Sequence, residues 1–261
     1  MAPDSAVWLY AVTRGVPAER LAGLAGVGGG PVGLVEAAGL VAVVGTVPLA
    51  EFGEEPLARN LENLPWLETV ARAHHHVVDT VARFGPVVPT RLATVYRDGA
   101  RVGAVLMQRQ AEFGTALDRV AGRVEWGVKA YAVPGASATA ALVPDRVDER
   151  PGLAYLRRRR AQLAGRELAQ QAALHSADQV HDVLGRHAEA ARRHTPQDRR
   201  LIGDTGWMVL NGAYLAAAAA TAEFATVVRE LADRHPTIRL ELTGPWPPYS
   251  FVAVQAGEAQ R

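Results

Sequence analysis

The sequence predicts an α/β protein of two domains, each a mixed β-sheet packed by helices in the general outline of ferredoxin-like folds. Short β-prone apolar runs alternate with longer stretches whose apolar residues recur every three or four positions. This pattern starts afresh at Arg123, and 261 residues are enough for two modest domains. We therefore expect an N-terminal domain over residues 1–122 and a C-terminal domain over 123–261, with helices on one face of each sheet.

The N-terminal domain is expected to follow the order β–β–β–α–β–α. Residues 6–13 (AVWLYAVT) are continuously apolar, which is typical of a central strand that is covered on both faces. A glycine-rich stretch at 23–33 lacks the GK[ST] of a phosphate-binding loop, so we interpret it as a connection. The remaining expected strands are 32–36, 40–47 and 87–96, and the expected helices are 57–84 and 98–121.

The C-terminal domain is expected to follow the order β–α–β–α–β. Its first strand is predicted at 124–133, followed by a linker of small residues over 134–151. The stretch 153–193 is predicted as one long helix that Thr195-Pro196 ends. The remaining expected elements are a strand at 207–210, a helix at about 216–234 and a strand at 237–242.

Composition narrows the function classes. The net charge is +1, so no global field favours nucleic acid or an acidic membrane. All but one of the 28 basic residues are arginine, with Lys129 the exception, which suggests GC-rich coding rather than a binding role. There is no cysteine, no apolar run long enough to span a bilayer and no signal-peptide pattern, so we expect a cytoplasmic protein without membrane association.

The residues that could carry chemistry do not form a catalytic or metal-binding pattern. His74, His75 and His76 are adjacent on a predicted helix, so their side chains point about 100° apart, whereas metal ligation requires i, i+3 or i+4 spacing. We expect one partly buried histidine between solvated ones. Ser137 lacks the second glycine of a nucleophile elbow. We therefore predict no enzyme activity, no cofactor and no metal site.

An arginine-rich region keeps a second function class open. Between Pro151 and Arg200 there are ten arginines and five acids, and Arg157 to Arg160 are consecutive. Four consecutive arginines surround a helix instead of forming a stripe, and interleaved aromatic residues are lacking. A nucleic-acid-binding protein that uses the predicted helix 153–193 is the alternative interpretation.

The segment LTGPWPPYSFV, from Leu242 to Val252, combines three prolines and three aromatic residues directly after a predicted strand. Prolines hold the backbone extended and cannot donate to a β-ladder. Trp246, Tyr249 and Phe251 would each bury about 150–250 Å² if covered. Two interpretations follow, and we favour the first: an intramolecular strap that pins the C-terminus across a domain boundary, or a partner-docking peptide of the PxxP type.

This terminal segment closely resembles the terminal signature of the gas vesicle protein F/L family (GvpF/GvpL). Other blocks are similar to the family in the same order, so the resemblance runs over nearly the full length. In the block PTRLATVYR, Leu92 and Ala93 replace the usual Phe-Gly. The similar blocks are WLYAVT at 8–13, Trp66-Leu67 with His74 and Val77-Val78, PTRLATVYR at 89–97, PGLAYL at 151–156 and NGAYL at 211–215.

The resemblance implies a minor accessory gas vesicle component of the cytoplasm or the vesicle, with no catalysis and no cofactor. Members of the family are thought to bind the small hydrophobic shell protein GvpA and other accessory proteins, and so to assist nucleation and assembly. The motifs do not separate F-type from L-type members. Because Pro89 cannot donate to a ladder, we expect a sheet edge or bulge there, and we take the sheet faces and this edge, with Pro89 and Arg91, as candidate binding surfaces.

Overall fold

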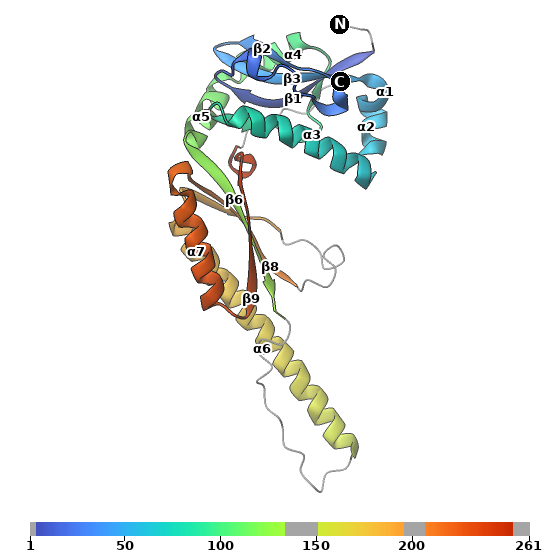
Figure 1. The fold of residues 1–261 in the computed structure, drawn as a ribbon. Coiled ribbons are helices and arrows are strands. Elements are labelled where there is room, and N and C mark those ends of the chain that lie inside the picture. The colour runs from blue at the N-terminus through green and yellow to red at the C-terminus, as the bar shows by residue number, and fades with distance from the viewer. Residues whose placement is uncertain (1–3, 134–150, 196–206, 253–261) are drawn as a thin grey trace. The chain divides into compact units, whose positions relative to one another are not determined.

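A computed structural model describes residues 4–133, 151–195 and 207–252, and it confirms the α/β class: two antiparallel sheets are packed by helices (Figure 1). The chain divides into two compact units. The first comprises Met1–Glu125 with Trp246–Arg261, and the second comprises Trp126–Pro245. Compared with the expected boundary between 122 and 123, this division assigns the last residues to the first unit. The predicted linker over 134–150 lies outside the described residues.

The sheet of the first unit is built around β1 (Ser5–Thr13), which is buried along almost its whole length, as its continuous apolar run predicts. The strand order is β2-β3-β1-β4, and β5 also pairs with β1. All of these pairings are antiparallel. The other strands are β2 (Val32–Ala37), β3 (Leu40–Pro48), β4 (Val87–Pro89) and β5 (Val95–Tyr96).

Helices cover both faces of this sheet, so the expectation of helices on one face is wrong for the first unit. Trp8 and Tyr10 of β1 pack with one helical layer, which contains α1 (Leu49–Phe52) and α3 (Leu64–Ala82). Val7 and Leu9 pack on the opposite face with α4 (Gly99–Gln108) and α5 (Gln110–Val120). The physical reason is the alternation of side chains along a strand, which sends successive apolar residues of β1 to opposite faces.

Both predicted long helices of the first unit are divided, one at a capping residue and the other at Arg109. The helix expected over 57–84 is interrupted, giving α2 (Glu54–Asn60) and then α3, whose first turn contains Pro65 as predicted. The Asn63 side chain accepts a hydrogen bond from the Trp66 N–H at 3.3 Å and so caps α3. Asp98 caps α4 in the same way at 2.8 Å, and a break at Arg109 separates α4 from α5.

The strand expected over 87–96 is likewise two short strands, β4 and β5. Both pair with β1, and the turn between them contains Ala93 at a φ of 63°. A left-handed residue interrupts a ladder, which explains the break. Glycine adopts this conformation without strain, whereas alanine does not.

In its described residues, the second unit contains a sheet in the order β7-β8-β6-β9 and two α-helices. Three predictions are wrong in detail. Residues 190–193, expected as the end of the long helix, form strand β7. The strand expected over 207–210 continues to Ala217, and the strand expected over 237–242 continues through Pro245 to Trp246. The elements are β6 (Arg123–Ala132), α6 (Pro151–Arg186), β7 (Ala190–Arg193), β8 (Met208–Ala217), α7 (Thr221–Arg234) and β9 (Ile238–Trp246).

Both helices of this unit contact the same core. Phe224 of α7 stacks on Trp126 of β6 at a centroid distance of 6.0 Å and also contacts Tyr214 of β8 at 5.8 Å. The Tyr214 hydroxyl is hydrogen-bonded to His181 Nδ1 of α6 at 2.8 Å. Among the described residues, no helix is both long and apolar enough to span a membrane.

The positive φ angles in the turn of the β2–β3 hairpin can be tested by substitution. Its turn residues Ala38 and Gly39 both have positive φ, 53° and 72°, as a two-residue type I′ turn requires. Asn tolerates the left-handed region better than Ala, and Ala38 is exposed. We expect Ala38→Asn to raise the free energy of unfolding by about 0.5–1 kcal/mol in urea denaturation. Gly39→Ala is the matched control and should lower it; a stabilising Gly39→Ala would contradict this turn type.

Candidate functional site

The C-terminal segment Trp246–Val252 packs on the first unit. Pro247 and Pro248 are buried, and the chain then forms a short 3-10 turn over Tyr249–Phe251. The Tyr249 N–H donates to the Pro247 carbonyl at 2.8 Å, and the Phe251 N–H donates to the Pro248 carbonyl at 3.3 Å. Prolines that lack a donor and a turn that bonds locally let this segment be covered without losing ladder hydrogen bonds.

The three aromatic residues of this segment differ in burial. Phe251 is 1% exposed, and Tyr249 packs against the core cluster that contains Trp8 and Tyr10. Trp246 is 41% exposed and meets His75 edge-on at a centroid distance of 5.1 Å. Tyr249 and Phe251 therefore pack into the core, whereas much of the surface of Trp246 is exposed to solvent. Whether the segment acts as a strap or as a docking peptide stays a prediction.

A buried carboxylate fixes the segment. Glu125 of β6 is 8% exposed and accepts two hydrogen bonds from Ser250, one from the backbone N–H at 2.7 Å and one from the hydroxyl at 2.6 Å. Bonds to an ionised acceptor are stronger than neutral ones. Sequence reasoning missed Glu125, although an acid within the apolar strand sequence VEWGV signals a buried group that needs a partner.

The three adjacent histidines have three different environments. His74 is buried, His75 is half-buried and His76 is exposed, so the expected mixture of one buried and two solvated rings holds only in part. The Trp8 indole N–H donates to His74 Nδ1 at 2.9 Å, which requires a neutral ring with its proton on Nε2. Burial lowers the pKa of His74 to about 4; the Thr90 backbone opposes this shift and the charge of His75 adds to it.

His75 faces the C-terminal segment. The Tyr249 hydroxyl lies 3.5 Å from His75 Nδ1, and the two rings are 6.1 Å apart. Burial raises the pKa of Tyr249, and the carboxylates of Asp79 and Glu125 raise it further. The structure thus brings Trp246, Tyr249 and His75 together. Within the described ranges, no group of three His, Cys, Asp or Glu side chains could hold a metal ion.

The other two candidate residues lie at the far end of the sheet order. Pro89 ends β4, pairs with Ala11 and is buried. Arg91 follows as the exposed residue of the turn, and its carbonyl accepts a hydrogen bond from the Thr94 hydroxyl at 2.7 Å. Only Arg91 of this pair presents its side chain to solvent.

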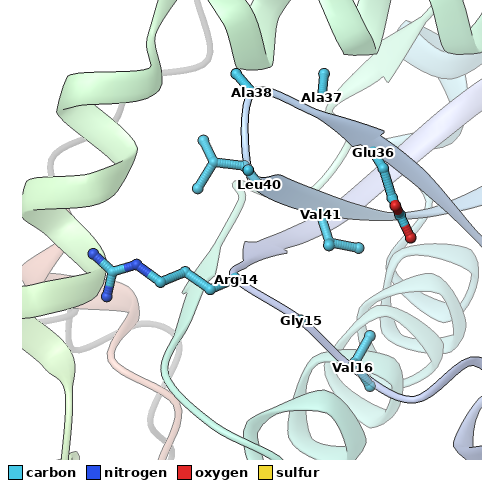
Figure 2. Close-up of a pocket in the computed structure, with 9 residues that line it drawn as sticks. Arg14, Gly15, Val16, Glu36, Ala37, Ala38, Leu40 and Val41 are labelled. Carbon is cyan, nitrogen blue, oxygen red and sulfur yellow. The ribbon is translucent and has the colours of Figure 1, made fainter.

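A surface hollow lies beside the β2–β3 turn and is lined by Arg14, Gly15, Val16 and residues 36–41 (Figure 2). In Figure 2 the Arg14 side chain extends away from Glu36. Its guanidinium pairs with Asp118 at 2.7 Å and donates to the Gly114 carbonyl at 3.2 Å. The charged groups of this hollow therefore do not converge on a common point, as those of a ligand site would.

Comparison with known proteins gives concordant matches. Residues 6–253 match the family model described as gas vesicle synthesis protein GvpL/GvpF. A protein of Streptomyces sp. (strain CB03234) named gas vesicle protein L is 42% identical over 255 residues, which cover 97% of this chain and 95% of that protein.

Two crystal structures of gas vesicle protein GvpF share the fold. The structure from Anabaena sp. PCC7120 has a TM-score of 0.69 and 19% identity, and the match covers 96% of this chain and 97% of that one. The structure from Microcystis aeruginosa has a TM-score of 0.64 and 15% identity, covering 95% and 98% of the two chains.

The buried His74 predicts a pH dependence of stability. In the unfolded chain a histidine takes up its proton near pH 6.5, whereas folded His74 does so only near pH 4. The unfolded state binds more protons in this window, so the contribution is complete above pH 6.5 and is lost as the pH falls towards 4. We expect the free energy of unfolding to fall by about 2 kcal/mol from this group between pH 7.5 and 5.

Urea denaturation at the two pH values measures this difference. His74→Asn keeps an acceptor for the Trp8 indole and should remove that part of the pH dependence. His76→Gln, which changes an exposed neighbour, should leave it in place. Equal pH dependence in the wild type and His74→Asn would contradict a neutral, buried His74.

The unequal burial of the three rings predicts unequal stability effects. We expect Phe251→Ala to lower the free energy of unfolding by about 3–5 kcal/mol, because it leaves a cavity in a packed core. Trp246→Ala should lower it by less than about 1 kcal/mol, since that ring is largely exposed. Thermal and urea denaturation of both variants give the comparison. Similar losses would mean that the segment is not anchored through Phe251.

Proposed function

Because this chain belongs to the GvpL/GvpF family of gas vesicle synthesis proteins, we propose that it is a minor accessory component that binds the shell protein and other accessory proteins to assist nucleation and assembly. Membership of this family implies a gas vesicle role, as the resemblance of the terminal segment, Leu242 to Val252, indicated. Binding of the shell protein GvpA and assistance in its assembly are the proposal. We place this activity in the cytoplasm and at the gas vesicle.

The observation that carries the proposal is the extent of the family match. Residues 6–253 include nearly all of the first unit, the whole of the second and the C-terminal segment that returns to the first. The model that matches is described as that of a gas vesicle synthesis protein, so a match over nearly the whole chain supports a role in gas vesicle synthesis.

Mass action provides the mechanism. Shell subunits that associate through apolar surfaces aggregate unless those surfaces are covered before placement. A protein that binds the unassembled subunit stabilises that form by RT ln(1 + [L]/Kd), which is about 2.7 kcal/mol at a hundredfold excess over Kd. The bound subunit then remains available for nucleation.

The accessible surfaces differ from those expected. Helices cover both faces of the first sheet, and Pro89 is buried at its β4 end. At the opposite end, β2 pairs with β3 alone among the described strands, and its residues are half-buried or exposed. Trp246, Arg91 and the β2 edge are therefore our candidates for partner contact, the last through strand addition.

The nucleic-acid alternative draws on the arginines of 153–193. One of these arginines, Arg193, lies on strand β7 instead of the helix and pairs with Asp178 at 2.6 Å. Titration with RNA at 50 and 200 mM salt tests it. Affinity that falls about 10³-fold or more between these concentrations would indicate extensive phosphate contact and favour the alternative.

We expect the purified chain to suppress light scattering when shell protein is diluted from denaturant into a solution that already contains it. Added after aggregation, it should have little effect, because the apolar surfaces are then paired. A pull-down that recovers no shell protein in either order of addition would overturn the proposed function. Trp246→Ala, compared with Phe84→Ala at a similarly exposed ring, then shows whether Trp246 is part of the binding surface.

A further inference from the structure

Helix α6 is packed along only part of its length. In its last turns, Ala177, Val180 and Leu184 are buried in the core of the second unit, to which α6 belongs. Ser176 is hydrogen-bonded to Thr237 at 2.9 Å. The earlier part of the helix extends beyond the sheet of its unit (Figure 1). Side chains described from Tyr155 to Ala172 are exposed or half-exposed. A helix that is unpacked over this length gains little from tertiary contacts, so its composition calls for another explanation.

Large apolar side chains in this part of α6 face solvent. Leu156 is 63% exposed, Leu163 46% and Leu174 39%. Intervals of 7 and 11 residues return to nearly the same direction on a helix with 3.6 residues per turn, so these three leucines form one stripe about 27 Å long. We call Leu156, Leu163 and Leu174 the leucine stripe. Leu168, 64% exposed, lies more than 100° round the helix from it.

Positive charge predominates beside the part of the leucine stripe formed by Leu156 and Leu163, and the acid Glu167 lies close to the line of the stripe. From Tyr155 to Ala172 the sequence contains five arginines and one acid, Glu167. Arg159 and Arg166 lie along one side of the stripe and Arg160 along the other, and all three are exposed. Arg157 and Arg160 carry like charges three residues apart, a spacing that destabilises a helix by a few tenths of a kcal/mol, so this clustering of arginines does not serve helix stability.

We propose that the leucine stripe and its flanking arginines form a docking surface for an acidic amphipathic helix of a partner protein. Leucines in single file fit the apolar seam of a second helix, and flanking arginines pair with carboxylates on its edges. Nucleic acid would contact the arginines but leave the leucines uncovered. A second copy of α6 would bring the same positive charge to the seam.

The proposal does not require that the partner be the shell protein. It concerns the second unit alone, and it adds a binding surface to those suggested under the proposed function. Failure of shell-protein capture would therefore leave it standing, and its own failure would leave shell-protein capture standing.

The test uses a fluorescent 21-residue synthetic helix with leucine at heptad a and d positions and glutamate at e and g. Binding to the full chain is followed by anisotropy at 150 mM salt. We expect Leu163→Glu to weaken binding at least about tenfold, as loss of a central contact does. The matched control Leu168→Glu places the same charge on another face and should change binding less than about twofold. Circular dichroism and thermal melting confirm that both variants fold.

Charge reversal tests the electrostatic part. Arg159→Glu with Arg160→Glu should weaken binding of the acidic helix and create binding of the same helix with lysine in place of glutamate. Glu167→Gln, which removes the one acid near the stripe, should strengthen binding of the acidic helix. A peptide of the same composition in scrambled order should not bind.

Three results would overturn the proposal. One is equal loss of binding in Leu163→Glu and Leu168→Glu, and another is equal affinity for the scrambled peptide. The third is binding of transfer RNA or of phosphatidylserine vesicles without binding of the acidic helix, which would assign this surface to nucleic acid or to lipid.

Discussion

Burial of β1 on both faces is the constraint on which the first unit depends. An apolar strand of this kind needs a helical layer on each side, and α3 and α5 provide the two layers. Its pairing register shifts between Leu9 and Ala11, and Thr90 compensates the irregularity by donating from its N–H and its hydroxyl to carbonyls of β1. The neutral His74 accepts a hydrogen bond from the indole N–H of Trp8 and so satisfies this buried donor.

The C-terminal segment completes this core from a distant part of the sequence. The chain leaves the first unit at Glu125 and returns to it at Trp246. The two hydrogen bonds between Glu125 and Ser250 join these crossing points. Phe251 then adds a buried ring. Burial of a carboxylate is costly unless it is hydrogen-bonded, so the return of the chain is specified by polar as well as apolar contacts.

Sequence periodicity predicted the β1 core, the α3 stripe and the order of most elements, because these depend on local spacing. Periodicity predicted one helix where α2 and α3 are separate, because the break at Asn63 depends on capping. It also predicted that the helix of α6 continues to Arg193, because strand β7 depends on its pairing with β8. The aromatic segment was singled out as unusual, and the structure covers Phe251 while leaving Trp246 largely exposed. Its partners Glu125 and His75 were missed, because contacts across more than a hundred residues leave no local pattern.

Two groups of apolar residues in this chain differ in burial, and they also differ in the charges that surround them. The rings of the C-terminal segment have few charged neighbours in sequence, and two of the three are covered. The leucine stripe of α6 is interleaved with arginines, which hold water at the helix surface and oppose pairing with a second copy. Arginine therefore keeps an exposed apolar surface soluble while leaving it open to a partner of opposite charge. The adaptor role proposed above would need both properties at once, because a surface that paired with itself would not be available to a partner.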